Sequence, residues 1–128
     1  MSRSRALLAA STALALLSMV TPSAHGAELV MFERTGCVWC ARFNSEIGPI
    51  YPKTEESRTA PLRRVDRDGP LPADLAGIDP GAFTPTFVVV DNGREIGRIQ
   101  GYPGEAFFFG LLDRILTATP RTADSVVN

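Results

Sequence analysis

We expect this chain to form one α/β domain with a four-stranded mixed sheet and helices on both faces. Short apolar runs typical of strands alternate with segments of helical spacing, in the order β-α-β, loop, β-hairpin, α. An Asn92-Gly93 pair between two strand-like segments marks a tight hairpin turn. With 128 residues, 45% of them hydrophobic and 21% charged, the chain has the size and balance of a single globular domain.

The first half of the domain has the pattern of a βαβ unit. Residues 29–32 are an uninterrupted apolar run, as in a strand buried on both faces. A helix is expected from Cys37 to residue 47, and a second helical piece over residues 51–58. Residues 62–66 form the next candidate strand. A spacing of about thirty residues with a helix between the strands predicts a right-handed crossover and parallel pairing.

The second half of the domain predicts a loop, a hairpin and a final helix. Residues 68–82 are rich in Gly, Pro and Asp and predict a loop, with one helical turn near 73–76. Residues 86–90 are the clearest strand, and residues 95–100 are its antiparallel partner. Pro103 suits the first turn of the last helix. Its apolar face comprises Phe107, Phe108, Leu111, Leu112, Ile115 and Leu116.

The first 26 residues have the order of a secretory signal peptide. Arg3 and Arg5 precede residues 6–20, an apolar run without a charge, and small residues at 24 and 26 occupy the positions that signal peptidase recognises. Fifteen uncharged residues fall short of the roughly 18–20 that span a bilayer. We therefore expect cleavage before Ala27 and export to the periplasm.

Removal of residues 1–26 changes what chemistry is open to the chain. It leaves 102 residues, 27–128, of which we expect 117–128 to be a flexible tail. The net charge falls from −1 to −3, so no basic excess favours nucleic acid as a partner. The single histidine, His25, is also lost, which excludes His-based acid–base catalysis, Ser-His or Cys-His nucleophiles and His metal ligands.

The two cysteines of the chain lie in one motif, Cys37-Val38-Trp39-Cys40. A C-x-x-C between a strand and a helix can close into a small, redox-active disulfide ring. Cys37 would lie at the helix N-terminus, where free N–H groups and roughly half a positive charge favour its thiolate. Cys40, one turn later and more buried, would be the resolving thiol. The expected chemistry is attack by Cys37 on a partner disulfide and release by Cys40 through a mixed disulfide.

Two other interpretations of the motif stay open. A zinc site needs four ligands, and two thiols without an imidazole would require carboxylates or a second protomer. A purely structural disulfide over about four residues restrains the unfolded chain little. Redox chemistry without a metal or another cofactor is therefore favoured. Trp39 is a candidate partner contact beside the disulfide, although packing beneath a neighbouring loop fits it equally well.

A second motif, Thr84-Pro85-Thr86, precedes the clearest strand. Together with the C-x-x-C and the order of elements, it resembles the thioredoxin superfamily over about residues 28–116. The resemblance implies that Pro85 is cis and faces the disulfide, and that the Thr84 backbone pairs with an extended substrate segment by β-augmentation. Thioredoxin has a buried Asp where this chain has Met31. Glu33 is the nearest carboxylate, but a solvated position fits it better.

A closer resemblance is to the periplasmic thioredoxins encoded in bacterial sulfur-oxidation (Sox) operons. The matching segments are residues 32–33, 36–37, 39–42, 46–54, 61–66 and 97–104. This resemblance implies a reductase that acts on disulfides or thiol adducts of the pathway's sulfur-carrier protein, through the carrier's reactive cysteine. We expect the domain itself to be a monomer. Electrons would come from an upstream thiol reductant such as a membrane thiol transporter. The alternatives are a non-catalytic binding module and a thiolate metal chaperone.

Overall fold

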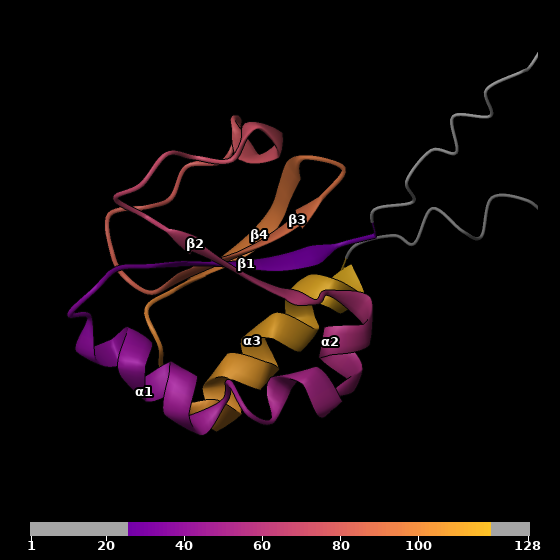
Figure 1. Ribbon diagram of the computed structural model, residues 1–128. Coiled ribbons are helices and arrows are strands. Elements are labelled where there is room, and N and C mark those ends of the chain that lie inside the picture. The colour runs from indigo at the N-terminus through magenta and orange to yellow at the C-terminus, as the bar shows by residue number, and fades with distance from the viewer. Residues whose placement is uncertain (1–25, 119–128) are drawn as a thin grey trace, which may run out of the picture.

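A computed structural model describes residues 26–118 of the chain (Figure 1). The expected signal peptide lies outside the described residues except for Gly26, and so does the expected tail beyond Ala118. Along the chain the elements are β1 (Glu28–Glu33), α1 (Val38–Glu46), the 3-10 helix η1 (Tyr51–Lys53), α2 (Glu55–Thr59), β2 (Leu62–Asp66), the 3-10 helix η2 (Ala73–Leu75), β3 (Thr86–Asp91), β4 (Arg94–Gln100) and α3 (Glu105–Ala118).

The four strands form one mixed sheet in the order β2-β1-β3-β4. β1 and β2 are parallel, while β3 is antiparallel to both β1 and β4. The expected βαβ unit followed by a hairpin is therefore confirmed. In the register of β1 and β3, Phe32 lies opposite Thr86. The carboxyl end of β1 and the start of β3 consequently meet at the same end of the sheet.

All three α-helices pack on one face of the sheet (Figure 1). Phe108 of α3 lies at the centre of this layer, with ring centroids 5.1 Å from Phe43 of α1 and 5.0 Å from Phe87 of β3. These rings are fully buried, together with Leu29 and Met31 of β1. Edge-to-face aromatic contacts of this kind add to the free energy of burial, so this side is the main core.

The opposite face of the sheet is covered by the long segment between β2 and β3. Leu75 and Ile78 of that segment pack on Val30 and Val88 in a second cluster of buried side chains. The expected helical cover on both faces takes the form of a single 3-10 turn here, η2, rather than an α-helix. The physical reason is composition, because Gly and Pro residues throughout 69–81 disfavour a continuous helix.

Two helical segments differ from their expected bounds. Residues 51–58 form two short helices instead of one, because Thr54 is extended and its Oγ1 accepts a hydrogen bond from the Ser57 N–H as the N-cap of α2. α3 begins at Glu105, so Pro103 precedes the helix and does not lie in its first turn, and the helix continues through Ala118, two residues into the expected tail. Phe107 and Leu111, expected on its apolar face, are exposed. No helix within residues 26–118 is long and apolar enough to cross a membrane.

Candidate active site

The two cysteines form a disulfide at the start of α1, as the motif predicts. Gly36 turns the chain with a φ of 78°, a conformation that favours glycine, and Cys37 follows as the N-cap of the helix. The Cys40 N–H donates a hydrogen bond to Cys37 Sγ over 3.1 Å. Cys37 is half-buried and Cys40 is only 3% exposed. A partner can therefore reach Cys37 and not Cys40.

Cys40 lies among apolar side chains of the main core. Met31, at the position of the thioredoxin aspartate, is fully buried in the same cluster and offers a thioether in place of a carboxylate. The nearby Glu33 carboxylate accepts a hydrogen bond from Asn44 Nδ2 over 3.0 Å and lies 3.9 Å from Arg64 Nε. Glu33 is thus half-buried and paired rather than simply solvated.

The Thr84–Pro85 peptide bond is cis, as the resemblance implies. Pro85 is buried, and its carbonyl oxygen accepts a hydrogen bond from the Gly101 N–H over 2.7 Å. Thr86 is paired with Phe32, and Cys37 follows the end of β1 by four residues. The topology therefore brings the Cys37–Cys40 pair and the cis-proline loop to the same end of the sheet.

Apolar side chains next to both motifs are exposed. Trp39 is 52% exposed, which favours the partner-contact interpretation over packing beneath a loop, and the Arg42 guanidinium lies 5.6 Å from the centre of its ring. Phe83, two residues before the cis-proline, is 63% exposed. Sequence reasoning did not single out Phe83, because the only signal was one aromatic residue in a loop of small and polar residues. Exposed aromatic side chains are frequent in binding surfaces.

A chain of polar contacts connects α1 with the segment before α3. Arg42 Nε lies 2.8 Å from Glu46 Oε1, and the Tyr102 hydroxyl donates a hydrogen bond to Glu46 Oε2 over 2.7 Å. The hydrogen bond from Arg42, and then that from Tyr102, lower the pKa of the Glu46 carboxyl. Burial, and then the contact with Glu46, raise the pKa of Tyr102 to about 12. Glu46 therefore stays ionised and holds both elements.

Metal ligation would need more donor groups than the two thiols supply. Among residues 26–118, no group of three or more His, Cys, Asp or Glu side chains is placed to hold a metal ion. The functional groups gathered at this end of the sheet are a disulfide, the cis-proline loop at the entry to β3 and two exposed aromatic rings. This arrangement suits thiol–disulfide exchange with an extended segment of another protein.

A solved structure of the periplasmic thioredoxin SoxS from Paracoccus pantotrophus, in its reduced form, is 47% identical to this chain. The similarity covers 71% of this chain and 96% of that chain, with a TM-score of 0.66. The chain belongs to the thioredoxin family. The family resemblance and the thioredoxin-like α/β fold expected from the sequence are thereby confirmed.

A second solved structure, the thioredoxin Mala s 13 from Malassezia sympodialis, shares the fold with this thioredoxin. It is 22% identical with a TM-score of 0.52, and the match covers 70% of this chain and 77% of that one. No protein-family model and no curated protein sequence matches the chain. With the family shown and Cys37 and Cys40 joined, this thioredoxin is a thiol–disulfide oxidoreductase whose substrates are protein disulfides.

Proposed function

We propose that this thioredoxin is a periplasmic reductase that acts on disulfides or thiol adducts of a partner protein. Cys37 is the nucleophile and Cys40 the resolving thiol. The observation that carries the proposal is the unequal burial of the two sulfurs: Cys37 is half-buried at the N-cap of α1, whereas Cys40 is almost fully buried. The Cys40 N–H at 3.1 Å from Cys37 Sγ favours the thiolate that attack requires.

The reaction consists of two exchanges that move two electrons. The Cys37 thiolate attacks one sulfur of the partner, which forms a mixed disulfide and releases the other sulfur as a thiolate that takes up a proton. Cys40 then attacks Cys37 Sγ, so that the Cys37–Cys40 disulfide forms and the partner leaves with its second thiol. Since Met31 offers no base, the Cys40 proton passes to water or to the departing thiolate. An upstream thiol reductant, for which we propose a membrane thiol transporter, restores the dithiol.

The cis-proline loop docks the substrate in this proposal. The backbone of Thr84 pairs with an extended segment of the partner beside Pro85, in the manner of an added strand. The rings of Trp39 and Phe83, both more than half exposed, provide apolar contacts on either side of the attacked sulfur. No cofactor takes part in either exchange.

The proposed partner is the sulfur-carrier protein of a sulfur-oxidation pathway, which presents a reactive cysteine. The 47% identity to the periplasmic thioredoxin SoxS supports both this partner and the periplasmic location. The charged, then apolar, then small-residue order of residues 1–26 supports export, with a monomeric domain over 27–128 after cleavage.

A trapping experiment tests the proposal. Without its resolving thiol, Cys40→Ser should accumulate a dithiothreitol-sensitive mixed disulfide in periplasmic extract from sulfur-oxidising cells, and mass spectrometry should identify the carrier joined through Cys37. Cys37→Ser is the matched control and should trap nothing. Absence of any covalent complex with Cys40→Ser would contradict the reductase proposal, and capture of unrelated proteins alone would contradict the carrier.

The same variants discriminate against the two alternatives. A non-catalytic binding module would keep its activity in Cys37→Ser, whereas a reductase loses insulin reduction in that variant. A thiolate metal chaperone would bind zinc or copper at one ion per reduced chain, a ratio that elemental analysis after dialysis measures directly. For zinc we expect substoichiometric binding, because two thiolates satisfy only half of a tetrahedral site. Copper bound at one ion per reduced chain would favour the chaperone, since soft thiolates suit Cu(I).

A further inference from the structure

We propose that Arg67 is a positioning residue that holds the substrate-docking loop against the strand leading to the cysteines. The docking loop is residues 79–85, which include Phe83, Thr84 and Pro85. The inference rests on the proposed function, since that proposal assigns substrate docking to this loop. Arg67 bonds to the Glu33 and Gly81 carbonyl oxygens and pairs with Asp68, and not with either sulfur, so its effect on the reaction is through the loop.

The docking loop has few apolar anchors of its own. The segment before it is held by Leu75 and Ile78, which are buried on the second face of the sheet. From residue 79 to 85 the chain contains no helix or strand, and the Phe83 ring is 63% exposed. The place of the loop before Pro85 therefore depends on polar contacts.

Arg67 contacts both β1 and the docking loop. Its backbone N–H donates to the Glu33 carbonyl oxygen over 2.8 Å, which extends the pairing of β1 with β2 by one residue. Its Nε donates to the Gly81 carbonyl oxygen, also over 2.8 Å, from a side chain that is 24% exposed. One residue thus joins the end of β1, four residues before Cys37, to the docking loop.

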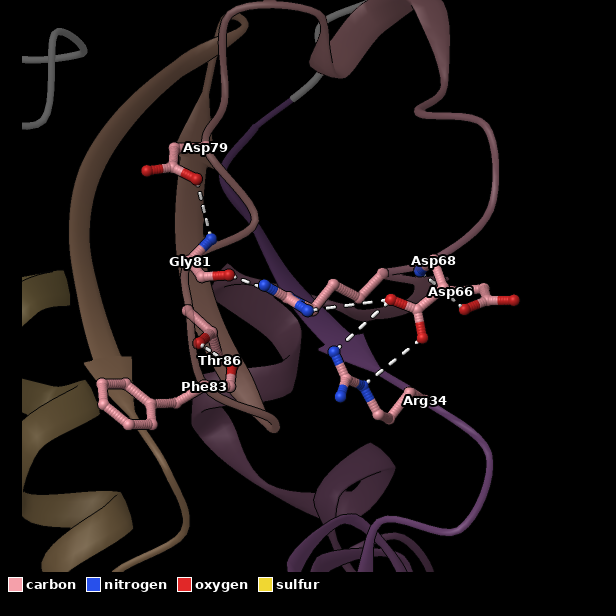
Figure 2. Close-up of polar contacts among 8 residues, drawn as sticks. Arg34, Asp66, Asp68, Asp79, Gly81, Phe83 and Thr86 are labelled. Carbon is pink, nitrogen blue, oxygen red and sulfur yellow. Dashed lines mark hydrogen bonds and ion pairs between the residues drawn. The ribbon is translucent and has the colours of Figure 1, made fainter.

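The loop is shaped to present the carbonyl that Arg67 binds. Gly81 has a φ of 80°, and a Cβ there would lie 3.0 Å from Thr86 Oγ1, so only glycine fits without strain. The Gly81 N–H donates to Asp79 Oδ1, and Thr86 Oγ1 donates to the Phe83 carbonyl oxygen. Figure 2 shows this turn, with a dashed line for the hydrogen bond that the Gly81 oxygen accepts from Arg67 Nε and the Phe83 ring pointing to the opposite side of the loop from Asp68 and Arg34.

The ion pairs around Arg67 are secondary to this hydrogen bond. Asp68 Oδ1 lies 3.7 Å from Arg67 Nη1, and Asp68 Oδ2 lies 3.4 Å from Arg34 Nε (Figure 2). Asp68 is more than half exposed and Arg34 is 41% exposed, and exposed ion pairs contribute little. A hydrogen bond from a charged donor to a half-buried carbonyl contributes more to stability than an exposed ion pair. The bond from Arg67 to the Gly81 carbonyl therefore positions the loop.

The consequence for the reaction is selective. Without the Arg67 contact, the loop occupies its docking conformation for a smaller fraction of the time, and the apparent affinity for a protein substrate falls by that fraction. The sulfur chemistry of Cys37 and Cys40 is unchanged. A small disulfide that meets Cys37 without docking on the loop should therefore react as before.

The test compares Arg67→Met with Arg58→Met in the purified full chain. Arg58 is an exposed arginine of α2 paired with Glu55, so both variants lose one positive charge and Arg58→Met leaves the site untouched. Dithiothreitol is the electron source, insulin the protein disulfide and hydroxyethyl disulfide the small one. For Arg67→Met we expect the KM for insulin to rise about tenfold, the factor near the low end for one lost hydrogen bond from a charged donor, with kcat changed less than twofold.

Further measurements separate the possible outcomes. The rate with hydroxyethyl disulfide should be unchanged, Arg67→Lys should recover part of the insulin KM, and Asp68→Asn should change it less than twofold. An unchanged KM in Arg67→Met, equal losses with both disulfides, or an equal effect of Asp68→Asn would each overturn the inference. Failure of the unsubstituted protein to reduce insulin would instead contradict the proposed function itself.

Discussion

Tyr102 shows at the scale of a single residue how this thioredoxin connects distant segments. Its ring is buried against Phe43 and Phe108, while its hydroxyl reaches Glu46 of α1 over 2.7 Å. Glu46 also pairs with Arg42, which lies over the Trp39 ring. The exposed Trp39 ring is therefore connected to the buried core through the Arg42 guanidinium, the Glu46 carboxylate and the Tyr102 hydroxyl.

The chain contains only two tyrosines, so their ionisation can be followed by phenolate absorbance. We expect Tyr102 to titrate near 12, with Tyr51 still higher because it is more deeply buried. A tyrosine whose pKa is raised by folding contributes its full stability below the pKa of the unfolded state, about 10. That contribution to the free energy of unfolding should be lost as the pH rises from about 10 to 12. Tyr102→Phe should flatten the fall in unfolding free energy over that window.

Glu46→Gln provides the control for the cause of this shift. The substitution removes a carboxylate that disfavours the phenolate, so the Tyr102 titration should move to lower pH while burial keeps it above its ordinary value. A Tyr102 midpoint near 10 in the unsubstituted protein would contradict the assignment.

At the scale of elements, Gly97 sets how closely α3 approaches the sheet. A Cβ at Gly97 would lie 2.6 Å from Ile115 Cγ2 and 2.8 Å from Ile115 Cγ1. These atoms branch from a stiff side chain that cannot easily turn away. Gly97 lies in β4 opposite Val89 of β3. A displacement of β4 at Gly97 would therefore also move β3, in the middle of the sheet.

Gly97→Ala should therefore lower the free energy of unfolding by about 1–3 kcal/mol, the usual cost of overpacking. Gly110→Ala is the matched control, because Gly110 lies in the exposed middle of α3 with open space around it. That substitution should raise the free energy by about 0.5–1 kcal/mol through helix propensity. Urea unfolding measures both. A Gly97→Ala variant as stable as the parent protein would rule out the tight contact.

A double variant identifies the clash partner. Since Ile115→Ala removes the crowded atoms, the cost of Gly97→Ala should shrink when the two substitutions are combined. Strictly additive costs would place the strain somewhere other than the α3–β4 contact.

At the scale of the whole molecule, the proposed periplasmic location requires that the chain is exported and processed. Small residues at 24 and 26 lie at the two positions that signal peptidase would recognise in the proposed cleavage before Ala27. When the full chain is produced in a Gram-negative bacterium, the periplasmic protein should have a mass that begins at Ala27. Ala24→Arg should block this cleavage, and His25→Arg, at the unread middle position, should not. An unprocessed chain confined to the cytoplasm would contradict the periplasmic proposal.

Much of the fold follows from local patterns in the chain. The strand expected at residues 62–66 is observed as Leu62–Asp66, and the Asn92-Gly93 turn joins β3 and β4. The C-x-x-C motif lies at the start of a helix because a glycine turn and a helical spacing surround it. Patterns of this kind depend on residues close together in the chain, so they predict local structure without knowledge of the tertiary structure.

The surroundings of the disulfide depend on contacts that no local pattern encodes. The segment 67–85 carries no periodicity, yet it folds over the second face of the sheet through Leu75 and Ile78. That path brings the Gly81 carbonyl to Arg67, fourteen residues earlier, and leaves Phe83 exposed. Adjacent residues alone were therefore enough to predict the order of the elements and the two reactive thiols. The position of the docking loop, in contrast, was decided by the tertiary structure, because burial of apolar side chains brings distant backbone and side-chain groups within hydrogen-bonding distance.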